Sequence, residues 1–321
     1  EREMKTKDVT ALGELLIDFA QKDTNTFEGN PGGAPCNVLA MLNKAGKKTA
    51  FIGKVGDDMF GNQLKSVIEE IGIDASGLVM DPEVRTTLAF VKFDETGDRD
   101  FSFYRNPGAD MMLKEEEVDL DLIKDSKIFH FGTLSMTHEG VREATKKAIA
   151  CAKEHGAIIS FDPNLRPPLW SDLNEAREQM KAGCALCDFL KIEDEELKFM
   201  TGKETIEEGV KELQDNYKIK MILVTSGPKG AQVYCNGHHV YKDAFLNRNT
   251  CDTTGAGDTF CGVCLSYLCE TPFEDFDEEK LADMLVHANA AASIVTTRIG
   301  ALKSMPTMEE VDQYIETFKQ P

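Results

Sequence analysis

Long apolar runs are missing from this chain of 321 residues. A membrane-spanning helix requires roughly 20 consecutive apolar residues, and no segment approaches that length. The charged opening, residues 1–8, does not resemble a secretory signal peptide. We therefore expect a cytoplasmic protein without membrane attachment.

Basic residues are scarce: 36 Lys and Arg stand against 56 Asp and Glu, which gives a formal net charge of −20. Nucleic acids and anionic membranes are bound through clusters of Lys and Arg, and no such cluster occurs in the sequence. We therefore expect neither as a partner. The acidic runs 115–117 and 193–196 are typical of solvated helix starts.

The nine cysteines are an odd number scattered through apolar segments, as is typical of reduced thiols. Cys184 with Cys187, and Cys261 with Cys264, have a spacing that zinc ligands also show. The second pair lies among apolar residues of helical spacing, whereas structural zinc ligands normally lie on turns. Buried thiols are therefore expected here rather than zinc.

The two best-known nucleotide-binding motifs, the P-loop and the dinucleotide fingerprint, are also absent. The nearest substitute is the stretch 225–230, Thr-Ser-Gly-Pro-Lys-Gly, which follows a strand-like run. Its glycines could cradle the phosphates or ribose of a nucleotide. A simple hairpin turn explains it nearly as well.

Apolar, β-branched runs alternate with segments of helical period along most of the chain. The strand-like runs are residues 9–12, 49–55, 128–131, 158–161, 189–192 and 221–225, and the helical segments, each ended by Gly, include 37–45, 63–71 and 141–155. This alternation predicts an α/β fold with a mainly parallel sheet. Ligands in such sheets bind beyond the carboxyl ends of the strands.

One region departs from this alternation. Residues 86–93 and 99–104 are β-like and are joined by a Gly-containing turn at 94–98, which predicts a hairpin. Together with the extended stretch 15–29 it could form a small separate sheet. Few helices would cover such a sheet, so we expect a lid over a site, a dimer surface, or both.

No internal repeat, low-complexity tract or long linker divides the chain. We therefore expect one domain over residues 1–321. Its lid should be formed by about 15–35 and 85–110.

The segment Asp252 to Asp258 combines an anion-binding turn with a carboxylate. Gly255 and Gly257 allow successive N–H groups to point at one spot, and a helix that begins there adds the positive end of its dipole. Asp258 would repel a bound phosphate but could take a proton from an attacking hydroxyl. This favours phosphoryl transfer to an alcohol. The alternative is a Gly-rich turn that caps a helix, with Asp258 complementing the dipole.

A second group of residues suits a polyhydroxy ligand. Gly32 and Gly33 allow close approach of the backbone, and Asn37 offers both a donor and an acceptor to hydroxyl groups. Asp18, after a strand-like run, could accept hydrogen bonds from two vicinal hydroxyls of a sugar. Alternatively, Asn37 caps a helix and Asp18 ends a strand.

A third motif, residues 162–170, directly follows a strand-like run. Its Pro-rich loop carries Arg166, and a stiffly held guanidinium suits phosphate or substrate oxygens. A structural salt bridge is the alternative role for Arg166.

Taken in order, these motifs resemble the ribokinase-like (PfkB) family of sugar kinases, and most closely its fructokinases. Gly32–Gly33 with residues 53–58 resembles the amino-terminal signature of the family, and residues 252–258 resemble the carboxyl-terminal one. The strings that resemble fructokinases are residues 13–19, 103–110 and 162–170. The resemblance, from Gly13 to Pro306, implies a ribokinase-like three-layer α/β sandwich with a mainly parallel central sheet and a small β-sheet lid.

The resemblance also implies roles for individual residues. Asp258 would be the general base, and the N–H groups of Gly255, Ala256 and Gly257 would form the anion hole. The sugar pocket would comprise Asp18, Gly32, Gly33 and Asn37, with Phe103 and Arg105 from the lid. Arg166 would contact the transferring phosphate or the sugar. Nucleotide contacts would come from Lys191, Glu193, Thr225, Gly227, Gly230, Gly257 and Asn289.

Two kinds of cation are implied as well. Glu196 would hold Mg²⁺ through water, although Glu193 replaces the Asn of the family's Asn-x-x-Glu motif, so that the metal network could differ. A monovalent cation, K⁺, would be held near the anion hole, mainly by backbone carbonyls. The residues at the corresponding positions are Asp252, Thr254, Val295, Arg298, Gly300 and Ser304.

The implied activity is ATP-dependent phosphorylation of fructose to fructose 6-phosphate by in-line transfer, in a homodimer paired through the lid. Alternatives within the family are a 2-keto-3-deoxygluconate kinase, a ribokinase and a nucleoside kinase. A phosphofructokinase is disfavoured, because the only basic residues seen near the lid are Arg99 and Arg105. A non-catalytic sugar-sensing protein is the alternative outside enzymes.

Overall fold

The computed structural model describes residues 4–93 and 99–319. Within these residues a central sheet has nine strands in the order β13-β12-β11-β10-β9-β8-β1-β4-β5. The strands from β11 to β5 in this order run parallel to one another, and β12 and β13 form an antiparallel extension. Their bounds are β1 Lys7–Leu12, β4 Thr49–Gly56, β5 Asp74–Asp81, β8 Ser126–Phe131, β9 Ile158–Phe161, β10 Phe189–Glu193, β11 Met221–Thr225, β12 Ala231–Cys235 and β13 His238–Lys242.

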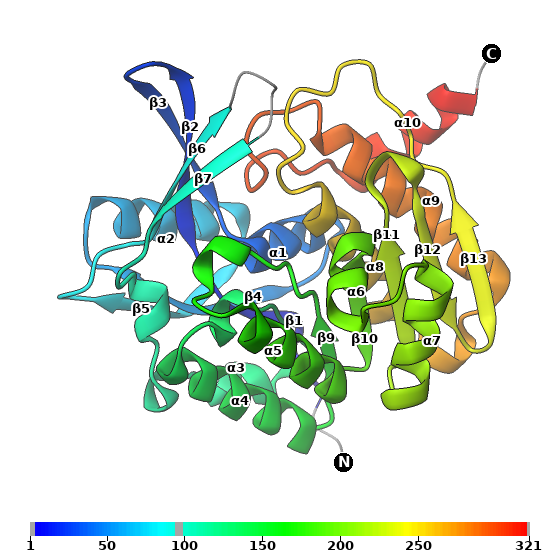
Figure 1. The fold of residues 1–321 in the computed structure, drawn as a ribbon, viewed down its shortest axis with the longest axis horizontal. Helices are drawn as coiled ribbons and strands as arrows, with labels where there is room; N and C mark the ends of the chain where they lie inside the picture. The colour runs from blue at the N-terminus through cyan, green and yellow to red at the C-terminus, as the bar shows by residue number, and fades with distance from the viewer. Residues whose placement is uncertain (1–3, 94–98, 320–321) are drawn as a thin grey trace.

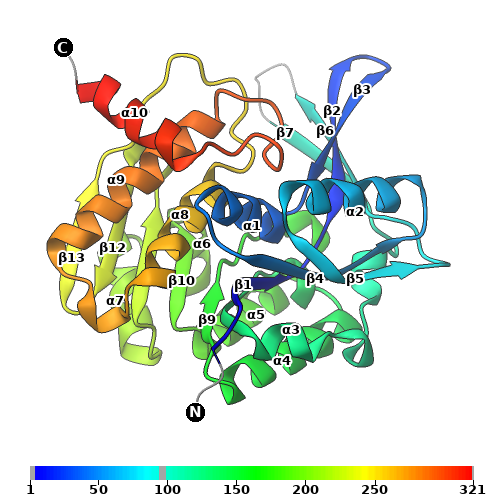
Figure 2. The same cartoon turned by 180° about the vertical axis from the view of Figure 1, so that it is seen from behind.

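Helices cover both faces of this sheet, because successive residues of a strand point to opposite sides. In β11, for example, Met221 and Leu223 join one hydrophobic core, whereas Ile222 and Val224 join the other. One face is covered by α1 Ala34–Lys44, α2 Met59–Ile71, α8 Ala256–Glu270, α9 Glu278–Val295 and α10 Met308–Lys319 (Figure 2). The other is covered by α3 Leu120–Lys124, α4 Glu139–Glu154, α5 Leu173–Leu186, α6 Asp194–Thr201 and α7 Ile206–Asn216 (Figure 1).

The expected strands and helices are confirmed. All six strand-like runs lie in the parallel part of the sheet. The helix expected from residue 63 begins earlier, at Met59, since the Asp58 side chain accepts the N–H of Gly61 at 2.8 Å and caps the first turn. It ends, as expected, at Gly72, whose left-handed φ of 103° is accessible to glycine.

A second, four-stranded sheet among the described residues has the order β3-β2-β6-β7 and projects from the body (Figure 1). It comprises β2 Leu16–Asp23, β3 Thr26–Gly32, β6 Leu88–Phe93 and β7 Arg99–Tyr104. The hairpin and its pairing with the earlier stretch are therefore confirmed, while the turn expected at 94–98 lies outside the described residues. Stacked aromatic rings, such as Phe19 and Phe90 at 5.0 Å between centroids, stabilise this lid sheet.

Membrane-crossing helices were not expected from the sequence. In the described part of the chain, no helix combines the length and apolarity that such a crossing needs.

Candidate active site

A cavity of about 320 Å³, here called the first cavity, lies between the lid sheet and the carboxyl ends of central strands. It receives residues from four separate motifs of the sequence: Asp18, Gly32–Gly33, Arg166 and the turn 255–258. Glu14 follows β1 and Glu193 ends β10, so both lie at the carboxyl ends of parallel strands, where ligands bind in sheets of this kind. The lid contributes Phe103.

The Gly-rich turn adopts the geometry expected for the start of a helix. Gly255 has a φ of 80° and immediately precedes α8. A Cβ atom at Gly255 would lie 2.2 Å from the Cβ of Ala301, so both the backbone conformation and the space require glycine. The first turn of α8 therefore presents its positive dipole end to the cavity. The N–H of Ala256 also donates to the Thr253 carbonyl at 3.3 Å.

Asp258 is held against Asn37, whose Nδ2 donates to Asp258 Oδ2 at 2.9 Å. Burial, and then the negative charge of Asp162, raise the pKa of Asp258 to about 6, although Asn37, Lys191 and Arg166 act in the opposite direction. Such a carboxylate is largely ionised at neutral pH and is more basic than an exposed aspartate. It therefore has the properties of a general base.

Lys191 is a buried cation beside this carboxylate. Its Nζ lies 3.3 Å from Asp162 Oδ2. Burial disfavours its charge, but the carboxylates of Asp162, Glu193, Glu196 and Asp258 outweigh burial and raise its pKa. A Cβ on Gly257 would lie 2.8 Å from Lys191 Nζ, so the ammonium group lies close to the backbone at the start of α8. Lys191 thus places positive charge at the start of α8.

Arg166 also lines the first cavity. The described residues give its side chain one hydrogen bond, to the Leu165 carbonyl at 3.2 Å, and no ion pair. The structural salt bridge considered from the sequence is therefore not what holds Arg166, and its guanidinium remains able to receive an anionic group.

Glu14 is a site residue to which the sequence analysis gave no role. It is 4% exposed, lines the first cavity, and its Oε1 accepts the N–H of Ala34 at the start of α1 at 3.0 Å. Burial raises its pKa to about 7. The available signal was a carboxylate that directly follows a strand in an apolar surrounding, Leu12 to Ile17.

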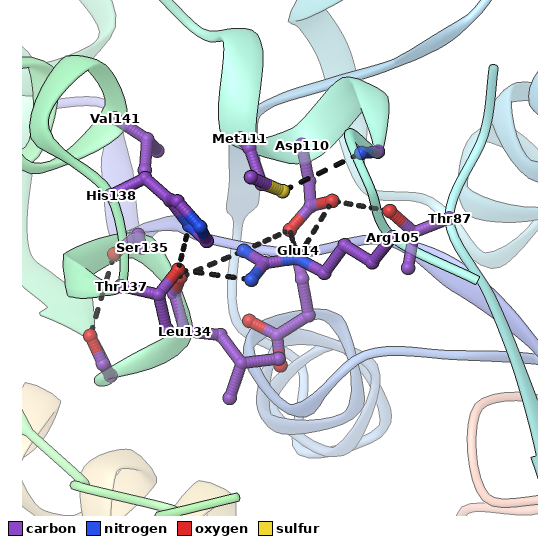
Figure 3. A network of polar contacts seen from close by, with 12 residues as sticks. Glu14, Thr87, Arg105, Asp110, Met111, Leu134, Ser135, Thr137, His138 and Val141 are labelled. Carbon is purple, nitrogen blue, oxygen red and sulfur yellow. Dashed lines mark hydrogen bonds and ion pairs between the residues drawn. The ribbon is translucent and has the colours of Figure 1, made fainter. Parts of the chain in front are cut away.

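Arg105 does not reach the first cavity, contrary to the expectation that it would contact the sugar from the lid. Its guanidinium is buried and pairs with Asp110, Nη2 to Oδ2 at 2.8 Å. It also donates to Thr137 Oγ1 at 2.9 Å and to the Leu134 carbonyl at 3.0 Å (Figure 3). Because Leu134 lines the cavity, Arg105 connects the end of β7 to the cavity wall.

A second cavity, of about 730 Å³, adjoins the first. Its lining includes the expected nucleotide residues Thr225, Gly227, Gly230 and Asn289 and the apolar side chains Phe245, Leu246, Phe260 and Ala292. Asn289 donates to the carbonyls of Lys242 and Asp243 at 3.2 and 3.1 Å, so it holds one wall. Lys191, expected to contact the nucleotide, lines the first cavity instead.

The residues expected around a monovalent cation fall into two groups. Asp252, Thr254 and Gly300 line the first cavity near Gly255. Val295 lies in the core, and the Arg298 guanidinium pairs with Glu310 and donates to the Ser304 carbonyl at 3.0 Å. A carbonyl bound to a guanidinium is a poor ligand for a further cation, so the donor set fits better at residues 252–254 and 300.

Glu196 lines neither cavity. Its Oε2 accepts the N–H of Leu165 at 2.7 Å, and its Oε1 accepts the N–H of Glu193 at 3.0 Å. Burial, and then the charges of Asp162 and Glu193, raise its pKa to about 7. The carboxylate therefore ties the loop after β9 to the start of α6.

Comparison with known proteins agrees with this geometry. The chain matches the pfkB family of carbohydrate kinases over residues 6–308. It is 40% identical over 315 residues to fructokinase-1 of Zea mays, covering 96% of this chain and 97% of that one. It is also 40% identical to probable fructokinase-2 of Arabidopsis thaliana, over 93% of each chain.

Solved structures show the same likeness. A fructokinase with bound ATP from Xylella fastidiosa superposes with a TM-score of 0.89 at 30% identity, covering 98% of this chain and 100% of that one. A Vibrio cholerae O395 fructokinase variant, with fructose, ADP and potassium bound, superposes with a TM-score of 0.87 at 30% identity, covering 98% of this chain and 100% of that one. These findings confirm the family resemblance and the ribokinase-like fold. The chain belongs to the pfkB family of carbohydrate kinases.

Proposed function

We propose that this protein is an ATP-dependent fructokinase that converts fructose to fructose 6-phosphate. The observation that carries the proposal is the contact of two cavities at the start of α8, where Asp258 lies beside the Gly255–Gly257 turn. The relatives named as fructokinases, and the related structures with fructose, ADP or ATP bound, support this substrate pair.

In the proposed reaction the first cavity holds the sugar and the second holds ATP. Asp258 takes the proton of the attacking hydroxyl, and Asn37 fixes the orientation of this carboxylate. The hydroxyl oxygen attacks the terminal phosphorus while the bond to ADP breaks, with no phospho-enzyme. Backbone N–H groups of residues 255–257, together with Lys191 and Arg166, offset the charge on the transferred group.

The carboxylates around both cavities suit hard cations with oxygen ligands. When bound, Mg²⁺ would offset the negative charge of the phosphate groups. We propose K⁺ near residues 252–254 and Gly300, in line with the potassium in the V. cholerae structure. In this chain, Glu196 then fixes the loop after β9 rather than acting as a direct metal ligand.

We also propose that residues 1–321 act as one kinase domain whose lid, about 15–35 and 85–110, closes over the sugar and excludes water. Both edges of the lid sheet are open and carry exposed aromatic side chains: Phe27 on β3 is 41% exposed and Tyr104 on β7 is 64% exposed. Such edges support a homodimer that pairs through the lid. The cytoplasmic location stays a prediction.

The decisive experiment is a coupled assay of ADP release over fructose, ribose, 2-keto-3-deoxygluconate, a nucleoside and fructose 6-phosphate. We expect the highest kcat/KM with fructose. A clear preference for another acceptor would replace fructose with that substrate. Binding of sugar and ATP without product would instead support the non-catalytic alternative.

A further inference from the structure

The segment between β13 and the Gly-rich turn, residues 243–251 and here called the connecting loop, borders both cavities. The loop residues that line the second cavity are Ala244, Phe245, Leu246, Asn247 and Thr250, and Cys251 lines the first. The loop continues directly into residues 252–258. It therefore leads from a wall of the proposed nucleotide cavity into the anion-binding turn.

Helix α9 and the residue after it hold the two ends of the connecting loop. Near the start of the loop, Ser293 Oγ donates to the Phe245 carbonyl at 2.7 Å. At its end, the N–H of Cys251 donates to the carbonyl of Thr296, just after α9, at 2.8 Å. The structure describes all of α9 and of residues 246–249, and no hydrogen bond joins the two. The middle of the loop needs support from elsewhere.

This support comes from the carboxyl-terminal helix, α10, which lies across α9 and packs against it (Figure 2). The hydroxyl oxygen of Tyr314, a half-buried residue of α10, lies 3.4 Å from Asn247 Nδ2 and 2.9 Å from Ser293 Oγ. The Tyr314 ring packs against Phe245, at 5.6 Å between centroids. One side chain of α10 thus contacts α9, the first part of the loop and its middle.

The donors in this cluster follow from the number of protons that each group carries. A carbonyl only accepts, so the single hydroxyl proton of Ser293 goes to the Phe245 carbonyl. The Tyr314 hydroxyl therefore donates to Ser293 Oγ and accepts an amide N–H of Asn247. Hydrogen bonds joined in such a chain strengthen one another. The Tyr314 hydroxyl is the link that joins the two loop residues.

Tyr314 lines neither cavity, and it lies outside residues 6–308, over which the chain matches the pfkB family. We infer that Tyr314 is a positioning residue for nucleotide binding: it fixes the connecting loop against α9 and so shapes a wall of the second cavity. This inference rests on the proposed function, since it requires a nucleotide in that cavity. Because coupling between two sites is reciprocal, a bound nucleotide should in turn stabilise α10.

The test compares Tyr314→Phe with Tyr267→Phe. Both changes remove one hydroxyl group and keep the ring. The Tyr267 hydroxyl, on α8, donates to Asp283 Oδ2 at 2.6 Å, and Tyr267 lines neither cavity. Calorimetry gives the Kd for ADP, and steady-state kinetics give kcat and the KM values for ATP and fructose. Hydrogen–deuterium exchange of the α10 amides, with and without ADP, measures the reciprocal effect.

In Tyr314→Phe we expect the Kd for ADP and the KM for ATP to rise about three- to tenfold, as the loss of one hydrogen bond predicts. The kcat and the KM for fructose should not change. ADP should slow amide exchange in α10 of the wild type and of Tyr267→Phe, and should slow it less in Tyr314→Phe. In Tyr267→Phe all of the kinetic values should match those of the wild type.

A merely structural role for Tyr314 would lower the free energy of unfolding and leave the Kd for ADP unchanged. That result would overturn the inference alone, as would an equal rise in the KM values for ATP and fructose, or exchange in α10 of the wild type that does not respond to ADP. A wild type that binds no ADP would overturn the proposed nucleotide cavity, and the inference with it.

Discussion

The two cavities differ in how they would recognise a ligand. The first is lined by charged and polar side chains on the ends of strands and helices, including Asp18, Asn37 and Asp258. The second is lined by the turn 225–230, by apolar side chains such as Phe245 and by mostly uncharged polar ones such as Asn289. Directional hydrogen bonds suit hydroxyl groups, whereas an apolar slot suits a flat base. Changes in the first cavity should therefore affect catalysis, and changes in the second should affect nucleotide affinity.

The largest expected effect is that of Asp258→Asn in the first cavity. The replacing amide oxygen can still accept the hydrogen bond from Asn37, but it cannot take the proton of the hydroxyl. Loss of a general base typically lowers the rate by about 10²- to 10⁴-fold. We expect kcat to fall within or beyond that range while fructose affinity, measured by calorimetry, changes by less than about threefold, since the hydrogen-bonding shape is kept.

The pH profile of the wild type tests the same assignment. The pKa of Asp258 is raised to about 6, so kcat/KM should fall as the pH drops below that value and the carboxylate becomes protonated. Near-normal turnover in Asp258→Asn, or an acid limb well below pH 5, would assign the base to another residue.

A smaller effect is expected from Glu14→Gln, measured as the free energy of unfolding in urea at pH 5 and pH 8. Glu14 has its pKa raised to about 7 in the folded protein, from 4.5, so its ionisation opposes folding. Its contribution is most favourable below the unfolded pKa and declines as the pH rises through 7. Relative to wild type, the variant should gain stability by up to about 3 kcal/mol between these pH values.

The control for this experiment is Glu69→Gln, an exposed carboxylate on α2. It should follow the wild-type pH dependence. If the free energy of unfolding of Glu14→Gln also changes with pH as that of the wild type does between pH 5 and 8, the buried carboxylate is not the group that couples stability to pH.

Much of the fold was predictable because its signals are local. The β-branched run 221–225 and the glycine that ends α2 at position 72 depend on neighbours in the sequence. That Arg166 and Asp258 would meet in one cavity was also predictable, since motifs after parallel strands converge on one edge of a sheet. The direction of the Arg105 side chain was not predictable, because it depends on the turn that brings its partner Asp110 next to it. The direction of a side chain is decided by tertiary packing, which a motif does not encode.

Glu14 and Glu196 illustrate the same limit. Both are acidic residues whose behaviour is determined by burial and by backbone N–H donors from distant segments, Ala34 and Leu165. A sequence shows that a carboxylate is present, but not whether its oxygens are already occupied. Glu196 is such a case, since both of its carboxylate oxygens already accept backbone N–H groups.

The smallest expected effect belongs to the second cavity, in Asn289→Ala. This change removes the two hydrogen bonds that hold the carbonyls of Lys242 and Asp243, at about 1 kcal/mol each. The wall of the second cavity that Asn289 holds should become less rigid. We therefore expect the KM for ATP to rise about three- to tenfold, the change in affinity that the loss of one such hydrogen bond corresponds to. The KM for fructose should stay unchanged.

Asn236→Gly is the matched control. It removes two side-chain hydrogen bonds to the carbonyls of Phe273 and Phe276, and glycine tolerates the positive φ of 51° at this position. Residue 236 lines neither cavity. It should lose stability without a change in either KM. An equal rise in both KM values for Asn289→Ala would show that the two cavities are not separable, because sugar and nucleotide recognition would then share one wall.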